Sequence, residues 1–364
     1  MIQEAQLTID LNSLAHNYNC LRSKLKEDTV LIAVVKANAY GTSSVRIAKE
    51  LVKLGTKHFA VAYTAEAVVL REATIKEDIM VFYPQIGQLD RIIEHQLEPV
   101  LYTVEIIKAF IVLLKQKNLK DYPVHIKCNT GLNRIGLSQE DLVFFLTKID
   151  ASSLNIKSIY SHLGASENLK PCPFTQHQIN AFEVVKKTVK ELCSTLPKFH
   201  LLNSSGVFNY PEHQLDAVRV GIGLYGFANQ TEWDLELQPI VKLSAPICQI
   251  HTLKKGENVG YNQGWEATKD SRIGIIPIGH ADGIGRQYGN GVGKVQILGQ
   301  TAPIIGNVCM DMLMIDLGAI RCQVGTEVIL FDKNTTASDF AATGNTISYE
   351  LLTGLNSRIQ RVYQ

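Results

Sequence analysis

Lys36 is the residue with the clearest chemical potential, because it follows the five apolar residues LIAVV (31–35). Burial of an amine disfavours its ammonium form and lowers its pKa, which suits a lysine that forms a Schiff base. A lysine at the end of a strand can equally extend its ammonium group into solvent. The residue alone leaves both interpretations open.

Further polar side chains stand where other apolar runs end. Lys127 ends one run, Arg134 follows it in a loop, His162 ends the next run, and Arg219 lies within the last one. Barrel enzymes place their reacting groups at the C-terminal ends of the strands, so these side chains are candidates for one site. A lone histidine such as His162 is more often structural, and only the coincidence of several residues favours the functional interpretation.

Two short loops could hold a phosphate group. NSSG (203–206) follows one apolar run, and GIG (221–223) follows the next. Serine hydroxyls and glycine N–H groups bind phosphate without a net positive charge, and the loops after the seventh and eighth strands are the usual phosphate site of barrel enzymes. Ordinary turn chemistry is the alternative explanation for both loops.

The composition excludes several classes of protein. The 364 residues include 36 basic and 35 acidic side chains, a balance that does not favour nucleic acid or a membrane surface as a partner. No apolar run approaches the roughly 20 residues that span a bilayer, and the start, MIQEAQLTID, predicts no signal peptide. The seven cysteines form no CxxC pair, so we expect no metal site, no disulfide framework and a cytoplasmic location.

The elements that must position these residues can be counted along the chain. Between the apolar runs lie stretches in which apolar residues recur every three or four positions, as in amphipathic helices. Continuous hydrophobicity indicates strands covered on both faces. Eight parallel strands with outer helices form a (β/α)8 barrel of roughly 200–250 residues. The runs are VLIAVVK (30–36), HFAVAY (58–63), DIMVFY (78–83), EPVLY (98–102), PVHIKC (123–128), IKSIYSH (156–162), KFHLLN (198–203) and AVRVGI (217–222).

The pattern changes after about residue 237. Apolar strands broken by Gly and Pro turns follow one another with few helical stretches between them, which predicts a mostly antiparallel β domain. The last 27 residues, from SDFAATG onward, read as a short helix and a tail. We therefore predict an α/β plus β fold, with a TIM-type barrel over residues 1–236 and a C-terminal β domain over residues 237–364.

The segment AVVKANAYG (33–41) resembles the pyridoxal-phosphate lysine motif of the fold-type III alanine racemases. The family has a barrel followed by a β domain and forms a head-to-tail homodimer, so the resemblance implies the same here. The resemblance extends along almost the whole chain, because many motifs share the order and spacing of the family. They include KCNTGLNRIG (127–136), IYSHLGASE (159–167), NSSG (203–206), VRVGIGLYG (218–226), VGYNQGW (259–265), PIGHADG (277–283) and APIIGNVCMDMLMIDLG (302–318).

The resemblance also implies a role for each candidate residue. Lys36 binds pyridoxal 5'-phosphate and acts as the base on one face of the substrate, and Tyr261 of the partner subunit acts on the other face. Arg134 and the partner subunit's Met310 hold the substrate carboxylate, and Lys127 can be carbamylated to brace Arg134. The remaining cofactor-binding residues are Tyr40, His162, Asn203, Ser204, Arg219, Gly221, Ile222 and Tyr349.

These roles agree with elementary chemistry. Racemisation removes a proton from one face and returns one to the other, which two bases achieve without rotating the substrate. A tyrosine has an ordinary pKa of about 10, so Tyr261 needs cationic neighbours, for which His162 and Arg219 are the candidates. Arginine keeps its proton near neutral pH, so Arg219 should leave the pyridine nitrogen unprotonated.

The chain departs from the family pattern at several positions. Asn38 and Asn129 stand where aspartate is usual, Asn133 where glycine is usual, and His280 where tyrosine is usual near the active-site entrance. All residues assigned to the chemistry remain. We therefore expect changes in rate, affinity or selectivity and no loss of catalysis.

The leading hypothesis is an alanine racemase that interconverts L-alanine and D-alanine and supplies D-alanine for peptidoglycan. Tyr349 favours alanine over serine only moderately, because a methyl and a hydroxymethyl group differ little in a tolerant pocket. A racemase for another amino acid is the second hypothesis. A pyridoxal-phosphate-binding protein without turnover is the third, and the second domain argues against it.

Overall fold

The computed structural model describes residues 4–168 and 170–364. The chain forms two compact units. One unit comprises Ala15–Ala39 and Ser44–Leu237, and the other comprises the described residues before Ala15 together with Tyr40–Ser43 and Gln238–Gln364. The first is called the barrel unit and the second the β unit. The predicted boundary between residues 236 and 237 stays a prediction.

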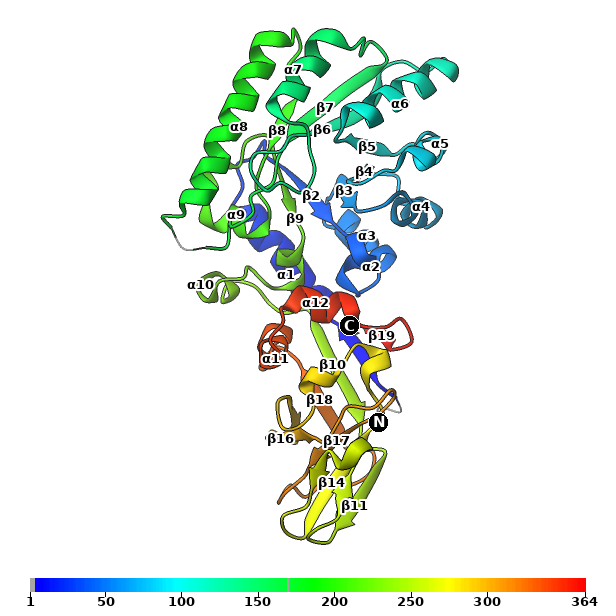
Figure 1. Cartoon of the computed structure of the whole chain (residues 1–364), viewed down its shortest axis with the longest axis vertical. Helices are drawn as coiled ribbons and strands as arrows, with labels where there is room; N and C mark the ends of the chain where they lie inside the picture. The colour runs from blue at the N-terminus through cyan, green and yellow to red at the C-terminus, as the bar shows by residue number, and fades with distance from the viewer. Residues whose placement is uncertain (1–3, 169) are drawn as a thin grey trace. The chain divides into compact units, whose positions relative to one another are not determined.

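The barrel unit contains a closed barrel of eight strands, each parallel to its neighbour, so the predicted strand count and barrel are confirmed (Figure 1). The last strand closes on the first, with Ile32 opposite Arg219. Apolar side chains fill the interior, among them Val34, Met80 and Tyr160. The strands are β2 (Val30–Val34), β3 (His58–Val61), β4 (Asp78–Val81), β5 (Glu98–Leu101), β6 (Tyr122–Lys127), β7 (Leu154–Tyr160), β8 (Lys198–His200) and β9 (Ala217–Val220).

Helices connect the barrel strands and cover them from outside (Figure 1). In α6 the buried residues Ile106, Phe110 and Leu114 recur at intervals of four, and Thr103 caps its first turn by accepting from the N–H of Ile106. The helices are α1 (Leu11–Ser23), α3 (Ser44–Lys53), α4 (Thr64–Glu72), α5 (Leu89–Glu94), α6 (Val104–Gln116), α7 (Gln139–Lys148), α8 (Pro173–Leu192), α9 (Ser204–Asn209) and α10 (Thr231–Asp234). Short 3-10 turns are η1 (Ile86–Gln88), η2 (Pro211–His213) and η3 (Ile222–Tyr225).

The β unit contains a nine-stranded sheet in the order β11-β14-β17-β16-β15-β18-β10-β1-β19. All its pairs are antiparallel except β1 with β19, which confirms the predicted mostly antiparallel domain. The strands are β1 (Gln6–Ile9), β10 (Val241–Pro246), β11 (Gln249–Leu253), β14 (Ser271–Ile276), β15 (Lys294–Ile297), β16 (Gln300–Ile305), β17 (Leu313–Asp316), β18 (Glu327–Phe331) and β19 (Gln360–Tyr363). A separate hairpin joins β12 (Asn258–Val259) and β13 (Trp265–Glu266), and the helical segments are η4 (Tyr261–Gln263), η5 (His280–Asp282), η6 (Arg286–Tyr288), α11 (Ala337–Thr343) and α12 (Ser348–Gly354).

Both chain ends depart from the expectation. Near the start of the chain, β1 pairs with β10 and β19, and its Leu7 and Ile9 are fully buried. The last 27 residues form two helices and a strand, whereas the sequence predicted one helix and a tail. The sheet therefore includes residues from both ends of the chain.

Two further properties concern only residues 4–168 and 170–364. In this part of the chain, no helix has the length and apolarity needed to cross a bilayer. It likewise contains no group of three or more His, Cys, Asp or Glu side chains that could hold a metal ion.

Candidate active site

Lys36 stands at the C-terminal end of β2 and begins a turn of unusual conformation, α2 (Lys36–Tyr40). Ala37, Asn38, Ala39 and Tyr40 all have positive φ angles between 51° and 53°. A left-handed conformation costs an L-residue roughly 1–2 kcal/mol, so other contacts must hold this turn in place.

The carboxylate of Glu66, in the first turn of α4, provides such contacts. Its Oε1 accepts from the N–H of Ala37 at 2.6 Å, and its Oε2 accepts from the N–H groups of Ala62 at 2.7 Å and Tyr63 at 3.1 Å. Hydrogen bonds to an ionised acceptor are stronger than neutral ones. Glu66 therefore fixes the backbone directly after Lys36, a function that the sequence did not reveal.

The surroundings of Lys36 favour its neutral amine. Burial lowers the pKa of Lys36, the positive charge of Arg134 lowers it further, and the negative charge of Glu66 opposes both effects. The neutral amine is the nucleophilic form of lysine. The environment thus supports the expected use of Lys36 in covalent chemistry.

Arg219, in β9, is 4% exposed and points its guanidinium at several acceptors. Its Nη1 donates to Nδ1 of His200 at 2.5 Å, and its Nη2 donates to the carbonyls of Ser161 at 2.7 Å and Leu201 at 3.1 Å. Burial lowers the pKa of Arg219 to about 10, so the group stays charged at neutral pH. Within the described residues, no hydrogen bond uses its Nε.

His162 lies beside Arg219 but does not share the positive charge. Nη2 of Arg219 lies 3.3 Å from Nδ1 of His162. Burial and the charges of Arg219, Lys127, Arg134 and Lys36 lower the pKa of His162 well below its ordinary value. The ring is therefore neutral, and the expected cationic character of the His162–Arg219 pair belongs to Arg219.

The two candidate phosphate loops contact each other directly. The hydroxyl oxygen of Ser204 accepts from the N–H groups of Gly221 at 3.0 Å and Gly223 at 3.1 Å. A Cβ at Gly223 would lie 3.2 Å from Cβ of Ser204, so a side chain there would need Ser204 to shift by a few tenths of an ångström. Asn203 caps α9 by accepting from the N–H of Gly206, and Ile222 begins η3. The barrel unit thus brings Asn203, Ser204, Gly221 and Ile222 together.

Lys127, at the end of β6, is buried without a carboxylate partner among the described residues. Its Nζ donates to the carbonyl of Cys128 at 3.0 Å and to the hydroxyl of Ser161 at 3.3 Å. Burial, together with the charge of Arg219, lowers the pKa of Lys127 to about 7. A large fraction of this amine is therefore neutral near pH 7.

The loop that carries Arg134 explains two departures from the family pattern. The side-chain oxygen of Asn129 accepts from the N–H groups of Gly131 at 3.1 Å and Asn133 at 3.0 Å, as an aspartate oxygen could. Asn133 has φ 55°, a conformation that asparagine tolerates better than most residues with a side chain. Its side chain also accepts from the Nδ2 of Asn129 at 2.9 Å. Arg134 follows on this loop with an exposed side chain.

In the β unit, Tyr261 and Met310 line the same groove. The groove has a volume of about 790 Å³ and is also lined by His251, Cys309 and Met314. Tyr261 is 70% exposed and Met310 is 59% exposed. The carbonyl of Tyr261 accepts from Nδ2 of Asn307 at 3.0 Å, which fixes the turn that presents the phenol.

The β unit also holds the two predicted phosphate-binding tyrosines. The rings of Tyr40 and Tyr349 lie with their centroids 6.0 Å apart. Gly41 follows with φ 84°, and a Cβ there would lie 2.3 Å from the carbonyl oxygen of Leu352, so this close approach requires glycine. The packing fixes the segment after Tyr40 against the end of α12.

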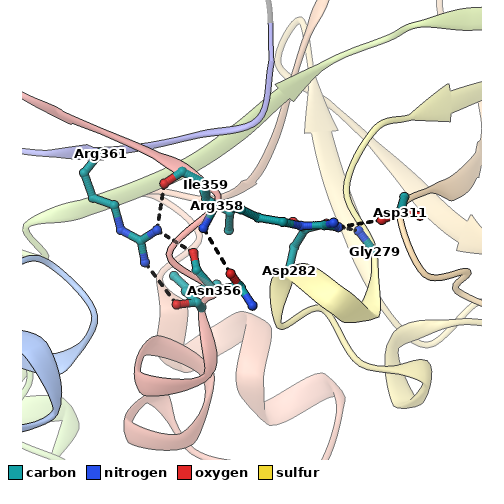
Figure 2. A network of polar contacts seen from close by, with 8 residues as sticks. Gly279, Asp282, Asp311, Asn356, Arg358, Ile359 and Arg361 are labelled. Atoms are coloured by element: carbon teal, nitrogen blue, oxygen red, sulfur yellow. Dashed lines mark hydrogen bonds and ion pairs between the residues drawn. The ribbon is translucent and has the colours of Figure 1, made fainter.

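Arg361 and Arg358 join several loops of the β unit (Figure 2). Arg361 donates to the carbonyl of Gly41 at 3.1 Å and to carbonyls of the segment before β19. Arg358 donates to Asp282 at 2.6 Å and to Asp311 at 2.8 Å, and Asp282 accepts from the N–H of Gly279 (Figure 2). Because Asp311 follows Met310, this network fixes the loop that carries Met310.

Comparisons with known proteins agree with this arrangement. The model of the alanine racemase N-terminal domain matches residues 9–229, and that of the C-terminal domain matches residues 240–363. An alanine racemase of Treponema denticola is 34% identical, and the alignment covers 98% of this chain and 97% of that protein.

Solved structures show the same likeness. An alanine racemase of Clostridium difficile 630 superposes with a TM-score of 0.92 at 30% identity, covering 100% of this chain and 96% of that one. An alanine racemase of Bartonella henselae with covalently bound pyridoxal phosphate has a TM-score of 0.90 at 29% identity, with 99% of each chain covered. Since both family models match in order along nearly the whole chain, the protein belongs to the alanine racemase family.

Proposed function

We propose that this chain interconverts L-alanine and D-alanine with pyridoxal 5'-phosphate as its cofactor. The observation that carries the proposal is the gathering of reactive groups at the C-terminal ends of the barrel strands. Lys36 follows β2, and Ser204 follows β8. Arg219 lies in β9, Gly221 follows it, and β9 neighbours both other strands. The full-length match to alanine racemases supports alanine as the substrate.

The residues present in the barrel fit the cofactor. Lys36 offers an amine whose lowered pKa favours the nucleophilic form. Arg219 is buried, charged and has an Nε that no described residue uses, which suits the acceptor nitrogen of a pyridine ring. Ser204 lies against Gly221 and Gly223, and because its oxygen accepts from their N–H groups, its hydroxyl proton is left to donate to a phosphate. When bound, pyridoxal phosphate withdraws electrons from the α-carbon of an amino acid and acidifies its α-proton.

Lys36 and Tyr261 would move that proton. Nζ of Lys36 accepts it from one face of the α-carbon, and the phenolic oxygen of Tyr261 of the partner subunit donates one to the other face, with the roles exchanged in the reverse direction. Arg219 would supply the positive charge beside the phenol of Tyr261, since His162 is neutral. Because Arg219 keeps its own proton, it donates to the pyridine nitrogen without protonating it.

Substrate binding would rest on Arg134 and on the partner subunit's Met310, which hold the carboxylate of alanine. The phosphate contacts would be completed by Tyr40, Ile222 and Tyr349, and Tyr349 would also restrict the space beside the substrate. Carbamylation of Lys127 would place a negative charge near Arg134. Its pKa of about 7 supports this step, because carbon dioxide reacts only with the neutral amine.

The proposal includes a head-to-tail homodimer in the cytoplasm, with D-alanine supplied for peptidoglycan. Tyr261 and Met310 are exposed in the single chain and line one groove, which supports their use by a partner. A monomer would lack these two side chains at its own Lys36. Activity should therefore fall when the protein is diluted below the dissociation constant of the dimer.

An amino-acid panel tests the function. The purified chain with pyridoxal phosphate is expected to convert L-alanine to D-alanine in deuterium oxide, with deuterium entering the α-position of both enantiomers. Lys36→Ala should abolish both signals, whereas Lys53→Ala, at a surface ion pair with Glu50, should leave them unchanged. If the chain turned over serine but not alanine, serine would be the substrate. If it bound the cofactor without any deuterium exchange, it would be a binding protein and not an enzyme.

A further inference from the structure

Five polar side chains on five neighbouring barrel strands, β5 to β9, form a continuous buried chain. Glu98 Oε2 lies 3.0 Å from Nε2 of His125, whose Nδ1 lies 2.7 Å from the hydroxyl of Ser158. That hydroxyl lies 2.8 Å from Nε2 of His200, and Nδ1 of His200 lies 2.5 Å from Nη1 of Arg219. All five residues are between 1% and 7% exposed.

The two ends of this chain fix the order of its donors, because a guanidinium can only donate and an ionised carboxylate can only accept. Arg219 can only donate, so Nδ1 of His200 must accept and the ring proton must sit on its Nε2. Burial and the charge of Arg219 lower the pKa of His200 well below its ordinary value, so the ring carries one proton. Nε2 of His200 then donates to Ser158. With one proton on the His125 ring, Ser158 donates to its Nδ1, and its Nε2 donates to Glu98. Every donor points from Arg219 toward Glu98.

Glu98 is ionised in this position. Burial raises the pKa of Glu98, but the hydrogen bond from His125 and nearby positive charges outweigh it and lower the pKa. Among the described residues of the barrel unit, Glu98 is the only buried carboxylate, and Arg219 is a buried cation. The chain therefore links a buried anion to the guanidinium through four hydrogen bonds.

We propose that Glu98, His125, Ser158 and His200 are positioning residues that hold the guanidinium of Arg219 in the orientation required at the cofactor nitrogen. The proposal rests on the proposed function, which places Arg219 at that nitrogen. Nδ1 of His200 accepts from Nη1 of Arg219, and backbone carbonyls accept from its Nη2. The guanidinium can therefore rotate only if its hydrogen bond to His200 breaks. Ser158 and His125 keep that acceptor in place, and Glu98 fixes the direction of the donors from the other end of the chain.

Two variants break the chain at different places. Ser158→Ala removes the group that joins the two histidines, and Glu98→Gln keeps an acceptor for His125 but removes the charge. Ser153→Ala is the matched control for the first, because Ser153 is buried in the same unit and its hydroxyl has no hydrogen-bond partner among residues 4–168 and 170–364. Asp78→Asn is the control for the second, because Asp78 pairs with His58 on neighbouring strands outside the chain.

The first measurement is the nitrogen-15 spectrum of the histidine side chains in the holoenzyme. In the wild-type protein and both controls, His200 should be a single tautomer with its proton on Nε2. In Ser158→Ala and Glu98→Gln, the His200 signals should shift toward a mixture of tautomers. This readout reports the chain itself and does not require turnover.

The second measurement is the rate of alanine racemisation. We expect kcat to fall about tenfold in Ser158→Ala and Glu98→Gln and KM to change less than about threefold, as for loss of roughly one buried hydrogen bond in the transition state. The controls should keep both constants. Unchanged His200 tautomers in the two variants, or an unchanged kcat, would overturn the proposal. Failure of the wild-type protein to racemise alanine would instead overturn the proposed function, while the spectrum would still decide whether the chain fixes His200.

Discussion

Asn38 and Asn129 stand at two positions where aspartate is usual, and both still provide a side-chain oxygen that accepts hydrogen bonds. The side-chain oxygen of Asn38 accepts from the N–H of Ser44 at 2.9 Å, and that of Asn129 accepts from two backbone N–H groups. Both amides therefore supply the acceptor that an aspartate would supply. The two negative charges are lost, but the hydrogen bonds to the local backbone are kept.

Lys127 leads to a prediction on pH. Its ordinary pKa is 10.5, and burial lowers it to about 7, so between these values the unfolded chain binds a proton that the folded chain does not. The cost of burying Lys127 is fully present below pH 7 and disappears as the pH rises toward 10. Relative to Lys127→Met, the wild-type protein should gain about 1.4 kcal/mol of stability per pH unit across this window.

Chemical unfolding of both proteins at pH 7, 8 and 9, in bicarbonate-free buffer that prevents carbamylation, measures this difference. Lys148→Met, at an exposed position near the end of α7, is the control and should show no such trend. A stability difference that stays constant with pH would show that Lys127 remains charged in the folded protein.

Glu66 leads to a second prediction. In Glu66→Gln, one amide oxygen must replace two carboxylate oxygens that accept from three N–H groups, and the amide NH2 would face a backbone donor. We expect a loss of about 2 kcal/mol in the free energy of unfolding and faster hydrogen exchange at the amide of Ala37. Glu72→Gln, exposed on the same helix, is the control. Unchanged exchange at Ala37 would show that Glu66 does not hold the turn after Lys36.

At the scale of elements, Arg361 fixes the short segment Tyr40–Ser43 to the β unit. It donates to the carbonyls of Gly41, Leu355, Asn356 and Ile359. A lysine at this position keeps the charge but cannot reach all four oxygens, because its donors share one nitrogen. Arg361→Lys should therefore lower stability by about 2–3 kcal/mol and speed hydrogen exchange in residues 40–43, as measured by mass spectrometry. Arg321→Lys, at an exposed position in the same unit, should change neither the stability nor the exchange rate. If residues 40–43 still exchanged slowly in Arg361→Lys, contacts other than Arg361 would hold this segment.

The barrel strands could be predicted from sequence because each is a continuous apolar run bounded by helical patterns. Strand β1 could not, because QLTI is short and its partners β10 and β19 lie more than 200 residues away along the chain. The left-handed turn after Lys36 was also hidden, since alanine does not favour that conformation. Glu66 and the buried chain from Glu98 to Arg219 depend on contacts between strands and helices, which no local pattern encodes. The roles of the site residues came from the family resemblance and stay predictions.

At the scale of the whole molecule, the proposed dimer would combine Lys36 of one subunit with Tyr261 of the partner subunit. Lys36→Ala and Tyr261→Phe should each have little activity alone. In a mixed dimer, one site contains both substitutions and the other contains neither. Co-expression of the two variants in equal amounts should therefore restore about a quarter of wild-type activity, because half of the dimers are mixed and each has one intact site.

The control for this experiment is the double variant Lys36→Ala/Tyr261→Phe co-expressed with the wild-type chain. Each site of that mixed dimer contains one substitution, so the mixed dimers should be inactive and only wild-type dimers should contribute. Native mass spectrometry counts the mixed dimers in both preparations. If Lys36 and Tyr261 acted within one subunit, the double-variant mixture would have active mixed dimers and the single-variant mixture would have none. Because each variant alone has little activity, the two mixtures decide which subunit supplies the second base.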